Sequence, residues 1–325
     1  MIILWIFRHS TAARFDSERK GNDVSIVADM TSAGMKDRYQ KMRELLPDVE
    51  ALSYLLGPDK ALEWLHSIGV ATDEVLRGMA PPIPPTNLRS IVAASSESVF
   101  LWTGIADSLN FINAFNRHRS GGDTKQRVLD FGCGCGRMTR FFGQIPGFET
   151  HGTDINVPTV TWCQANLASV TTKANGFLPP LDYTDNFFDL VYSLSIFTHL
   201  PEQGSQAWLA EIARILAPGG VAVLSTHGKQ AVDIIAASER HHAMFRVTKE
   251  RAEELRDSFA SKGFQYIQCD PETLAAADAG DDYGHSFTHE NYIREVWPQS
   301  GLQVVEFIPG GVRGWQDIVV LKKPL

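Results

Sequence analysis

Three alternate glycines that follow a short apolar segment constrain the fold of this chain more than any other feature. Val128 and Leu129 suit a buried parallel strand, and Gly132, Gly134 and Gly136 come directly after it. Glycines lack a Cβ, so the backbone can turn sharply and approach a ligand closely. The next residues favour a helix, whose first N–H groups would point back at the loop and attract a carboxylate or phosphate. We therefore predict a ligand-binding strand, turn and helix over residues 127–142.

Two acidic residues, Asp130 and Asp154, follow successive predicted strands, and the second could bind a nucleoside. Glycine loops of this kind also occur in dinucleotide-binding enzymes, so the surrounding residues must decide between the two. Residues 149–155 read as a second strand, and this strand ends near Asp154, 24 residues after Asp130. A carboxylate at this place can accept both hydroxyls of a ribose.

The rest of the chain continues the alternation of strands and helices. Residues 185–199 read as a buried strand that opens into a loop, and 208–220 as a helix ended by a turn. Residues 221–226 read as another strand. Two late runs, 304–308 and 316–321, are close enough in sequence to pair as a hairpin.

The order of these parts resembles the class I S-adenosylmethionine-dependent methyltransferases. The matching pieces are the cofactor loop 129–136, the ribose acid Asp154, the fourth strand 188–192 and the turn 216–220 before the fifth strand. The resemblance covers about residue 124 to the C-terminus. It implies an α/β fold with a doubly wound, mostly parallel seven-stranded sheet and an antiparallel C-terminal edge hairpin. Within the family, residues 193–201 and 309–324 resemble bacterial members associated with glycan or secondary-metabolite modification.

The resemblance also implies a cofactor, S-adenosyl-L-methionine, and a set of residues that bind it. We expect Asp130 to orient the loop through backbone N–H groups or to contact the amino group of the cofactor directly. Asn175 could bond the adenine edge and Phe177 could flank the ring, although Asn175-Gly176 is equally a turn signal. The complete expected set is Asp130, Gly132, Cys133, Gly134, Gly136, Asp154, Ile155, Asn175, Gly176, Phe177 and Ser193.

Two histidines are candidates for a catalytic base. Methyl transfer is an in-line displacement in which the enzyme mainly supplies alignment. A hydroxyl acceptor must also lose its proton. His199 is the first candidate, because it follows the fourth strand and such strand ends face the ligand crevice. His227, at the end of the fifth strand, is the second. The alternative for His199 is a loop histidine that only bonds the backbone.

The acceptor class follows from a missing motif. After the fourth strand stand residues 193–196, Ser-Leu-Ser-Ile, where relatives that methylate amino groups of nucleic acids carry Asn/Asp-Pro-Pro-aromatic. We therefore predict O-methylation of a sugar or small-metabolite hydroxyl, with a phenolic or carboxyl oxygen left open. The rival hypotheses are a nicotinamide-dependent oxidoreductase and a non-catalytic scaffold protein that binds the cofactor.

Charge and cysteine usage bound the partners and the compartment. The net charge is −8 and no run of Lys and Arg is present, which disfavours a nucleic-acid partner. The apolar segment 1–7 is too short to span a bilayer, and no other run approaches that length. Cys133 and Cys135 lie inside the glycine loop, where a disulfide would distort the turn. A cytoplasmic protein is the simplest reading, and we expect no metal, because a second closely spaced cysteine pair is missing.

The sequence divides into two parts. We expect residues 1–120 to form a helical N-terminal extension, with a Pro-rich connector at 81–85 and a last helix over 97–117. This extension would pack on the catalytic domain or on a second subunit, forming a homo-oligomer. Residues 121–325 would form the methyltransferase domain. Within it we expect an inserted cap at about 228–290, with helices near 229–240 and 248–262.

Overall fold

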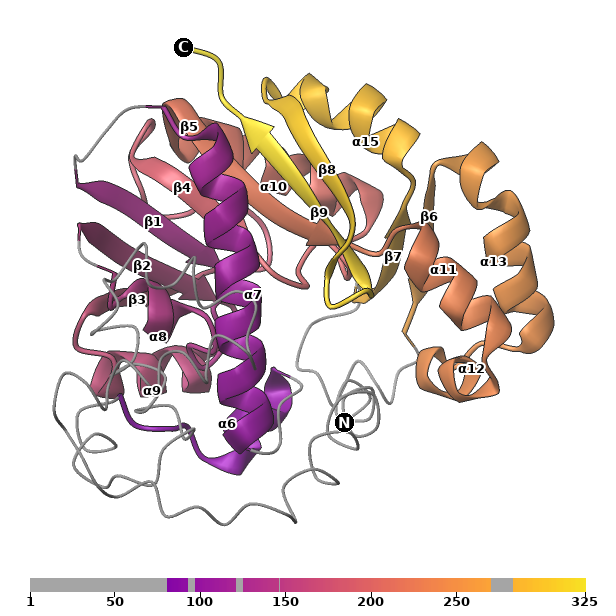
Figure 1. The fold of residues 1–325 in the computed structure, drawn as a ribbon, viewed down its shortest axis with the longest axis horizontal. Helices are drawn as coiled ribbons and strands as arrows, with labels where there is room; N and C mark the ends of the chain where they lie inside the picture. The colour runs from indigo at the N-terminus through magenta and orange to yellow at the C-terminus, as the bar shows by residue number, and fades with distance from the viewer. Residues whose placement is uncertain (1–80, 93–96, 121–124, 146, 270–282) are drawn as a thin grey trace, which may run out of the picture.

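A seven-stranded sheet forms the centre of the molecule. The computed structural model describes residues 81–92, 97–120, 125–145, 147–269 and 283–325. The strand order is β3-β2-β1-β4-β5-β9-β8 (Figure 1). The first five strands in this order are mutually parallel, whereas β9 runs antiparallel to both β5 and β8. The strands are β1 (Gln126–Phe131), β2 (Phe148–Asp154), β3 (Val170–Ala174), β4 (Phe188–Ser193), β5 (Leu216–Thr226), β8 (Gln303–Val312) and β9 (Gln316–Lys322). The predicted fold class, including the antiparallel C-terminal hairpin, is confirmed.

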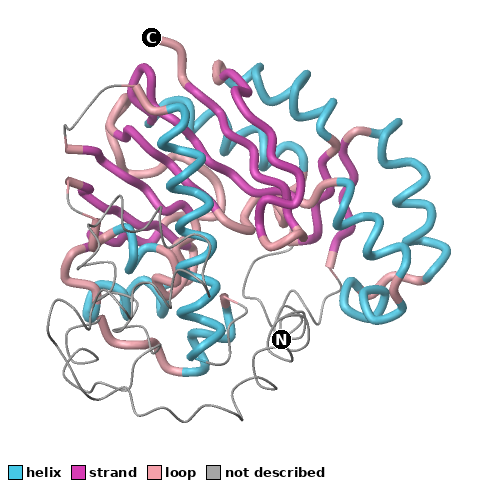
Figure 2. The backbone as a smooth tube through the Cα atoms, viewed as in Figure 1, coloured by secondary structure: helices cyan, strands magenta, loops and turns pink. Residues whose placement is uncertain are grey.

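Helices connect the strands and cover both faces of the sheet, as Figure 2 shows in cyan. The helix predicted over 97–117 is confirmed, and it extends one residue further. The helices are α6 (Thr86–Ile91), α7 (Glu97–His118), α8 (Thr139–Phe142), α9 (Val157–Asn166), α10 (Glu202–Ile215), α11 (Lys229–Ala237), α12 (Glu239–Phe245), α13 (Lys249–Lys262) and α15 (Glu290–Val296). The helix α6 and the strand β3 were not predicted. The helices expected before residue 81 lie outside the described residues.

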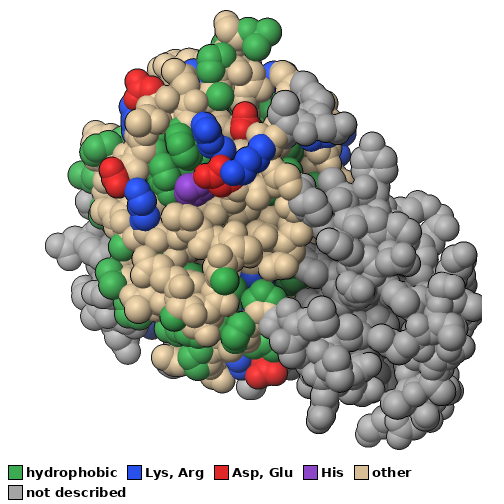
Figure 3. Space-filling model, turned by 90° about the vertical axis from the view of Figure 1, so that its left-hand side faces the viewer, with side chains coloured by type: hydrophobic (Ala, Val, Ile, Leu, Met, Phe, Trp, Pro, Cys, Tyr) green, Lys and Arg blue, Asp and Glu red, His purple; other side chains and the backbone are tan. Residues whose placement is uncertain are grey.

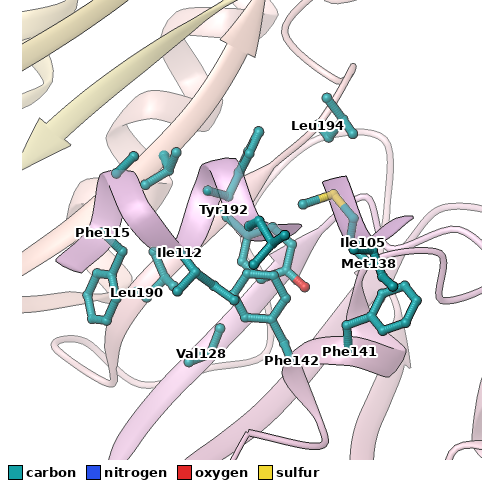
Figure 4. Packing of buried hydrophobic residues seen from close by; sticks show 14 of the residues in the cluster. Ile105, Ile112, Phe115, Val128, Met138, Phe141, Phe142, Leu190, Tyr192 and Leu194 are labelled. Atoms are coloured by element: carbon teal, nitrogen blue, oxygen red, sulfur yellow. The ribbon is translucent and has the colours of Figure 1, made fainter. Parts of the chain in front are cut away.

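One face of the sheet is covered by α7 and α8. Alternate residues of each strand point to this side, as the pleat of a strand requires. Leu190 and Tyr192 of β4 pack here, and the ring of Tyr192 stacks on Phe142 with 4.1 Å between centroids. Figure 4 shows Ile112 and Phe115 of α7 beside Leu190 and Tyr192. Burying each such side chain contributes about 1.5–3 kcal/mol, which fixes α7 across the sheet.

The opposite face is covered by α10 and by α15 with the turn that follows it. Leu129, Val191 and Val319, the intervening residues of their strands, belong to this second core cluster. Trp208 of α10 packs on Phe131 with 4.5 Å between ring centroids. Both faces of the central strands are therefore shielded from solvent, which explains their nearly continuous apolar runs.

The segment between β5 and α15 forms a smaller unit at one end of the sheet. Three helices, α11 to α13, pack around their own apolar cluster, which includes Val232, Leu255 and Phe287. Two helices were predicted here, near 229–240 and 248–262. The first is interrupted because Ser238 has an extended backbone, so α11 and α12 are separate. An antiparallel pair, β6 (Phe264–Gln268) and β7 (Gly284–Thr288), was not predicted.

The Pro-rich connector at 81–85 has no regular structure, as expected. It is tied to the domain by Arg140, which donates to the carbonyl oxygens of Pro81 and, at 3.0 Å, of Pro82. No helix in the described part of the chain is long and apolar enough to cross a membrane. Figure 3 shows the face on the β3 side, where basic and acidic side chains are interspersed with apolar ones.

Candidate active site

The glycine loop between β1 and α8 has the backbone that its sequence predicted. Gly132, Gly134 and Gly136 all have positive φ, at 85°, 51° and 77°. A Cβ added to Gly132 would lie 2.3 Å from Cδ1 of Ile196, and one added to Gly134 would lie 2.3 Å from Cγ1 of Val92. Larger residues at these two positions would therefore be both strained and crowded. The loop is a narrow backbone cradle beside the carboxyl ends of β1 and β4.

Asp154 at the end of β2 is bonded directly to this loop. Its Oδ2 accepts the N–H of Gly134 at 2.7 Å, and its Oδ1 accepts the N–H of Asn156 at 2.8 Å. Each carboxylate oxygen keeps a second lone pair, and the side chain is only partly buried. Burial raises the pKa of this carboxyl, and the two N–H bonds lower it. The arrangement fits a carboxylate that receives two hydroxyl groups of one ligand.

Asp130 at the end of β1 is buried and bonded to the helix that follows the glycine loop. Its side chain is 3% exposed, and Oδ2 accepts the hydroxyl of Thr139 at 2.6 Å. Burial raises the pKa of Asp130 to about 7. The N–H of Gly134, one of the loop groups that Asp130 was expected to bind, donates to Asp154 instead. The alternative, a contact between Asp130 and the amino group of the cofactor, stays a prediction. Asp130 ties β1 to the start of α8.

Exposed apolar side chains follow Asp154 and Phe177. Ile155 is 42% exposed and Leu178 is 62% exposed, which is high for residues of this type. The N–H of Asn175 donates to the carbonyl of Asp154 at 3.0 Å, so the 175–178 turn lies beside the end of β2. The Nδ2 of Asn175 donates to the carbonyl of Gly176 at 2.7 Å. The Oδ1 of Asn175 is buried and has no hydrogen-bond partner among the described residues, so the turn and the adenine contact both stay predictions.

Two other expected cofactor residues have buried side chains. Ser193 is 0% exposed, and its hydroxyl donates to the carbonyl of Phe131 at 2.8 Å. Its side chain is therefore held within the sheet, and its role at the cofactor stays a prediction. Cys133 is also buried, and its N–H donates to the carbonyl of Thr153 at 2.9 Å. Cys133 thus contributes to the shape of the loop.

The two candidate bases are held by one strand of the unpredicted pair. The Nδ1 of His199 lies 2.8 Å from the carbonyl oxygen of Gly284, and the Nδ1 of His227 lies 3.2 Å from that of Ser286. A carbonyl only accepts, so Nδ1 carries the proton and Nε2 is the free acceptor in each neutral ring. Burial lowers the pKa of His199 to about 4 and that of His227 to about 3.

The strand β7 reaches these histidines because it lies along the carboxyl ends of β4 and β5. The N–H of Ser286 donates to the carbonyl of Thr198 at 2.8 Å, and the N–H of Thr288 donates to that of His227 at 2.9 Å. Alternate N–H and C=O groups on one edge of β7 are thereby satisfied. Its other edge pairs with β6.

Sequence reasoning missed the residues that close the site. Ile196 and Val92 cover two of the loop glycines, and Gln316 at the start of β9 donates to the hydroxyl of Ser195 at 2.7 Å. Ser195 has a φ of 64°, unusual for a residue with a side chain, and marks a bend after β4. The position of Ser195 two residues after the end of a buried strand was the available signal. Among the described residues, no group of three His, Cys, Asp or Glu could hold a metal.

Comparison with known proteins identifies the segment that contains the loop. Residues 128–220 match the family model described as a methyltransferase domain. The chain is 31% identical over 109 residues to a sterol 24-C-methyltransferase of Schizosaccharomyces pombe, covering 32% of this chain and 28% of that protein. It is also 31% identical over 100 residues to the 2-methyl-6-phytyl-1,4-hydroquinone methyltransferase of Synechocystis, covering 30% of this chain and 31% of that protein. The chain thus spans less than a third of the length of these curated relatives.

Solved structures with a similar arrangement have low sequence identity. The 1,6-didemethyltoxoflavin-N1-methyltransferase of Burkholderia thailandensis, with S-adenosylhomocysteine bound, has a TM-score of 0.44 and 15% identity. The matched region covers 76% of this chain and 93% of that one. The CcbJ methyltransferase of Streptomyces caelestis has a TM-score of 0.45 and 15% identity, with 68% and 90% covered. It is the family model that matches residues 128–220, the segment with the glycine loop and Asp154, to a methyltransferase domain.

Proposed function

We propose that this protein is a class I S-adenosylmethionine-dependent methyltransferase. The observation that carries the proposal is the bond between Gly134 and Asp154, which joins the glycine cradle to a partly exposed carboxylate at the ends of two parallel strands. Such strand ends are where open α/β sheets bind ligands. The match of residues 128–220 to a methyltransferase-domain model supports the same reading.

Each part of the cradle has a task in holding the cofactor. S-adenosylmethionine, when bound, supplies a methyl group on positively charged sulfur. Asp154 would accept the ribose hydroxyls, and the exposed Ile155 and the partly exposed Phe177 would contact the adenine. Gly132 and Gly134 would allow the close approach of the remainder of the molecule. This orientation is the main contribution to an in-line transfer.

The acceptor in this proposal is a hydroxyl of a sugar or small metabolite. The Nε2 of His199 is free to accept the hydroxyl proton, since its Nδ1 is occupied by Gly284. His227 is held in the same tautomer and is the second candidate. The two curated relatives are named for methylation of sterols and of a hydroquinone, which supports methyl transfer in general.

The rival oxidoreductase accounts less well for the sheet. The antiparallel β9 is inserted between β5 and β8, whereas the dinucleotide-binding sheet is built from parallel units. A non-catalytic scaffold would not need the ordered imidazoles of His199 and His227. A methyltransferase accounts for both the antiparallel β9 and the ordered imidazoles.

The proposal extends to the compartment and the partners. Cys133, Cys135 and Cys163 are buried free thiols, which suits the reducing cytoplasm. The net charge of −8 suits a small-molecule or glycan acceptor better than a nucleic acid. The segment before residue 81 would mediate a homo-oligomer.

Calorimetric titration with S-adenosylhomocysteine tests the proposal. We expect the wild-type protein to bind this ligand, and Asp154→Asn to weaken binding at least tenfold, because an amide accepts the ribose hydroxyls less strongly than a carboxylate. Asp182→Asn is the matched control, since Asp182 is an exposed carboxyl that pairs with Lys173 away from the loop. Binding of NAD without binding of S-adenosylhomocysteine would favour the oxidoreductase.

A further inference from the structure

A cluster of imidazole and aromatic rings lies beside the cofactor loop. We define the ring cluster as His199, His227, Phe245, Tyr283, His285, Phe287 and Trp315. His199 stacks on Tyr283 with 4.6 Å between centroids and an angle of 14°, and it lies 5.5 Å from His285. His227 stacks on Phe287 and meets Trp315 edge to face at 5.6 Å. Five segments distant in sequence contribute to this cluster.

A single turn connects the ring cluster to the glycine loop. Ile196 covers Gly132, and the carbonyl of Ile196 accepts the N–H of His199 at 2.9 Å. His199, Tyr283 and Trp315 are only partly buried, whereas His227 and His285 lie beneath them. The partly exposed rings therefore offer a surface within one turn of the place where the cofactor would lie.

The three imidazoles of the ring cluster are neutral at pH 7. Burial lowers the pKa of each of its three imidazoles, and the only charged groups that contribute to these shifts are the other imidazoles of the cluster. Asp317, two residues after Trp315 in the sequence, has a buried carboxyl that accepts the N–H of Gly310. A carboxylate or phosphate brought against these three neutral imidazoles would lose water and gain no charged partner from them, which is costly.

The cluster also contains a buried nitrogen without a partner. His285 is 8% exposed, and its Nδ1 has no hydrogen-bond partner, while its Nε2 lies 3.7 Å from Sγ of Cys269. Polar atoms this buried are normally satisfied by protein, water or a ligand.

From this geometry we infer that the acceptor is an uncharged phenol, whose ring lies against the partly exposed pair of rings formed by His199 and Tyr283. This inference rests on the proposed methyl transfer and narrows its acceptor from any hydroxyl to one on an aromatic ring. Flat rings stack on such faces, and each good aromatic pair adds binding beyond the buried area.

The acidity of the hydroxyl points the same way. The imidazoles of His199 and His227 have lowered pKa values of about 4 and 3, so they are weak bases. A phenol has a pKa of about 10. A sugar or aliphatic hydroxyl has a higher pKa than a phenol, closer to that of water. Proton transfer to these rings is therefore less unfavourable from a phenol than from a sugar hydroxyl.

The reaction step balances with the groups already named. The phenol proton passes to the Nε2 of His199, and the phenol oxygen forms a bond to the methyl carbon. The bond from that carbon to sulfur breaks, and its electron pair stays on sulfur. The products are an aryl methyl ether, a neutral thioether and a protonated imidazole, which then returns its proton to water.

A matched set of acceptors tests the inference with the full chain and methyl-labelled S-adenosylmethionine. The set contains 4-methylphenol, 2-naphthol, 4-methylcyclohexanol, methyl glucoside and 4-hydroxybenzoate. We expect methyl ethers from the two phenols, with kcat/KM at least tenfold above that of the cyclohexanol, the glucoside and the charged benzoate. Equal or better transfer to the cyclohexanol or glucoside would overturn the phenol assignment, and equal transfer to the benzoate would overturn the requirement for an uncharged ring.

Binding of S-adenosylhomocysteine, measured on the same sample, separates the two proposals. If this ligand binds and neither phenol is methylated, the acceptor inference fails while the proposed function stands. If it does not bind, both fail. A second test uses Tyr283→Leu, which should raise KM for 2-naphthol about fivefold, the loss expected for one ring pair. Tyr292→Leu is the control, because Tyr292 is a partly buried tyrosine outside the ring cluster. Equal KM values for the two variants would place the phenol elsewhere.

Discussion

Gly136 is the loop glycine at which crowding and backbone strain can be separated. Its φ is 77°, and an added Cβ would lie 2.6 Å from Cδ1 of Leu167 and 3.3 Å from Sγ of Cys163. Gly147 has a φ of 85° but nothing within 4 Å of such a Cβ. We expect Gly147→Ala to cost about 1 kcal/mol of unfolding free energy from strain alone. Gly136→Ala should cost about 1–3 kcal/mol more, because it also overpacks the core. Urea unfolding of both variants measures the difference, and equal losses would contradict the crowding.

His199 is the residue whose catalytic role is most open to a direct test. If its Nε2 accepts the acceptor proton, His199→Ala should lower kcat by about 10²-fold or more, with little change in cofactor affinity. His118→Ala is a suitable control, since His118 pairs with Glu306 at the end of α7. Single-turnover methyl transfer and calorimetry give the two quantities. An unchanged kcat would leave His199 with only its bond to Gly284.

For single residues, the sequence predicted the place in the fold better than the hydrogen-bond partners. The positive φ values of the loop follow from glycine itself, so Gly132 and Gly134 could be assigned. The hydrogen bonds of Asp130 and Ser193 could not, because they go to Thr139 and Phe131, and a sequence does not show which polar group is closest. The fixed tautomer of His199 was equally invisible, since it depends on a carbonyl 85 residues away.

At the scale of elements, one buried carboxylate joins α7 to the glycine loop and to the β8–β9 turn. Asp107 is 0% exposed, and its Oδ2 accepts from Nη1 of Arg137 at 2.7 Å. Its Oδ1 lies 3.4 Å from Nε of Arg313. Asp107→Asn should cost about 3 kcal/mol of unfolding free energy, because two guanidinium groups lose their shared negative charge. Thermal or urea unfolding checks this value. Asp182→Asn, at an exposed ion pair, should change the unfolding free energy little. Equal losses in the two variants would show that the buried Asp107 network stabilises the fold no more than an exposed pair does.

The elements that were missed are short or weakly patterned. The central strands and α7 were found because long apolar patterns have one dominant period. The six residues of α6 cover less than two turns, and β7 is a five-residue strand that is wholly buried. The strand β6 had a usable signal, since Gly263 has a φ of 72° at the end of α13 and aromatic residues alternate with glutamine after it.

At the scale of the whole molecule, buried titratable groups make opposite contributions to the pH dependence of stability. The pKa values of His199 and His227 are lowered to about 4 and 3, below the unfolded value of about 6.5. Between these limits the unfolded chain binds more protons, so their contribution rises with pH. The pKa values of Asp130 and Asp317 are raised to about 7 and 6, above the unfolded value of about 4. In that range the native state binds more protons, so their contribution falls as pH rises.

Replacing Asp130 by Asn separates these two trends. The amide can still accept the Thr139 hydroxyl, but it has no proton to lose. Relative to wild type, Asp130→Asn should therefore gain stability as pH rises from about 4 to 7, by up to roughly 4 kcal/mol. Its stability curve should rise more steeply than that of wild type, because the histidine contribution is no longer opposed by Asp130. Urea unfolding at intervals of half a pH unit measures both curves. Parallel curves would mean that Asp130 is already ionised in the native protein, and hence that a charge can be tolerated under the glycine loop.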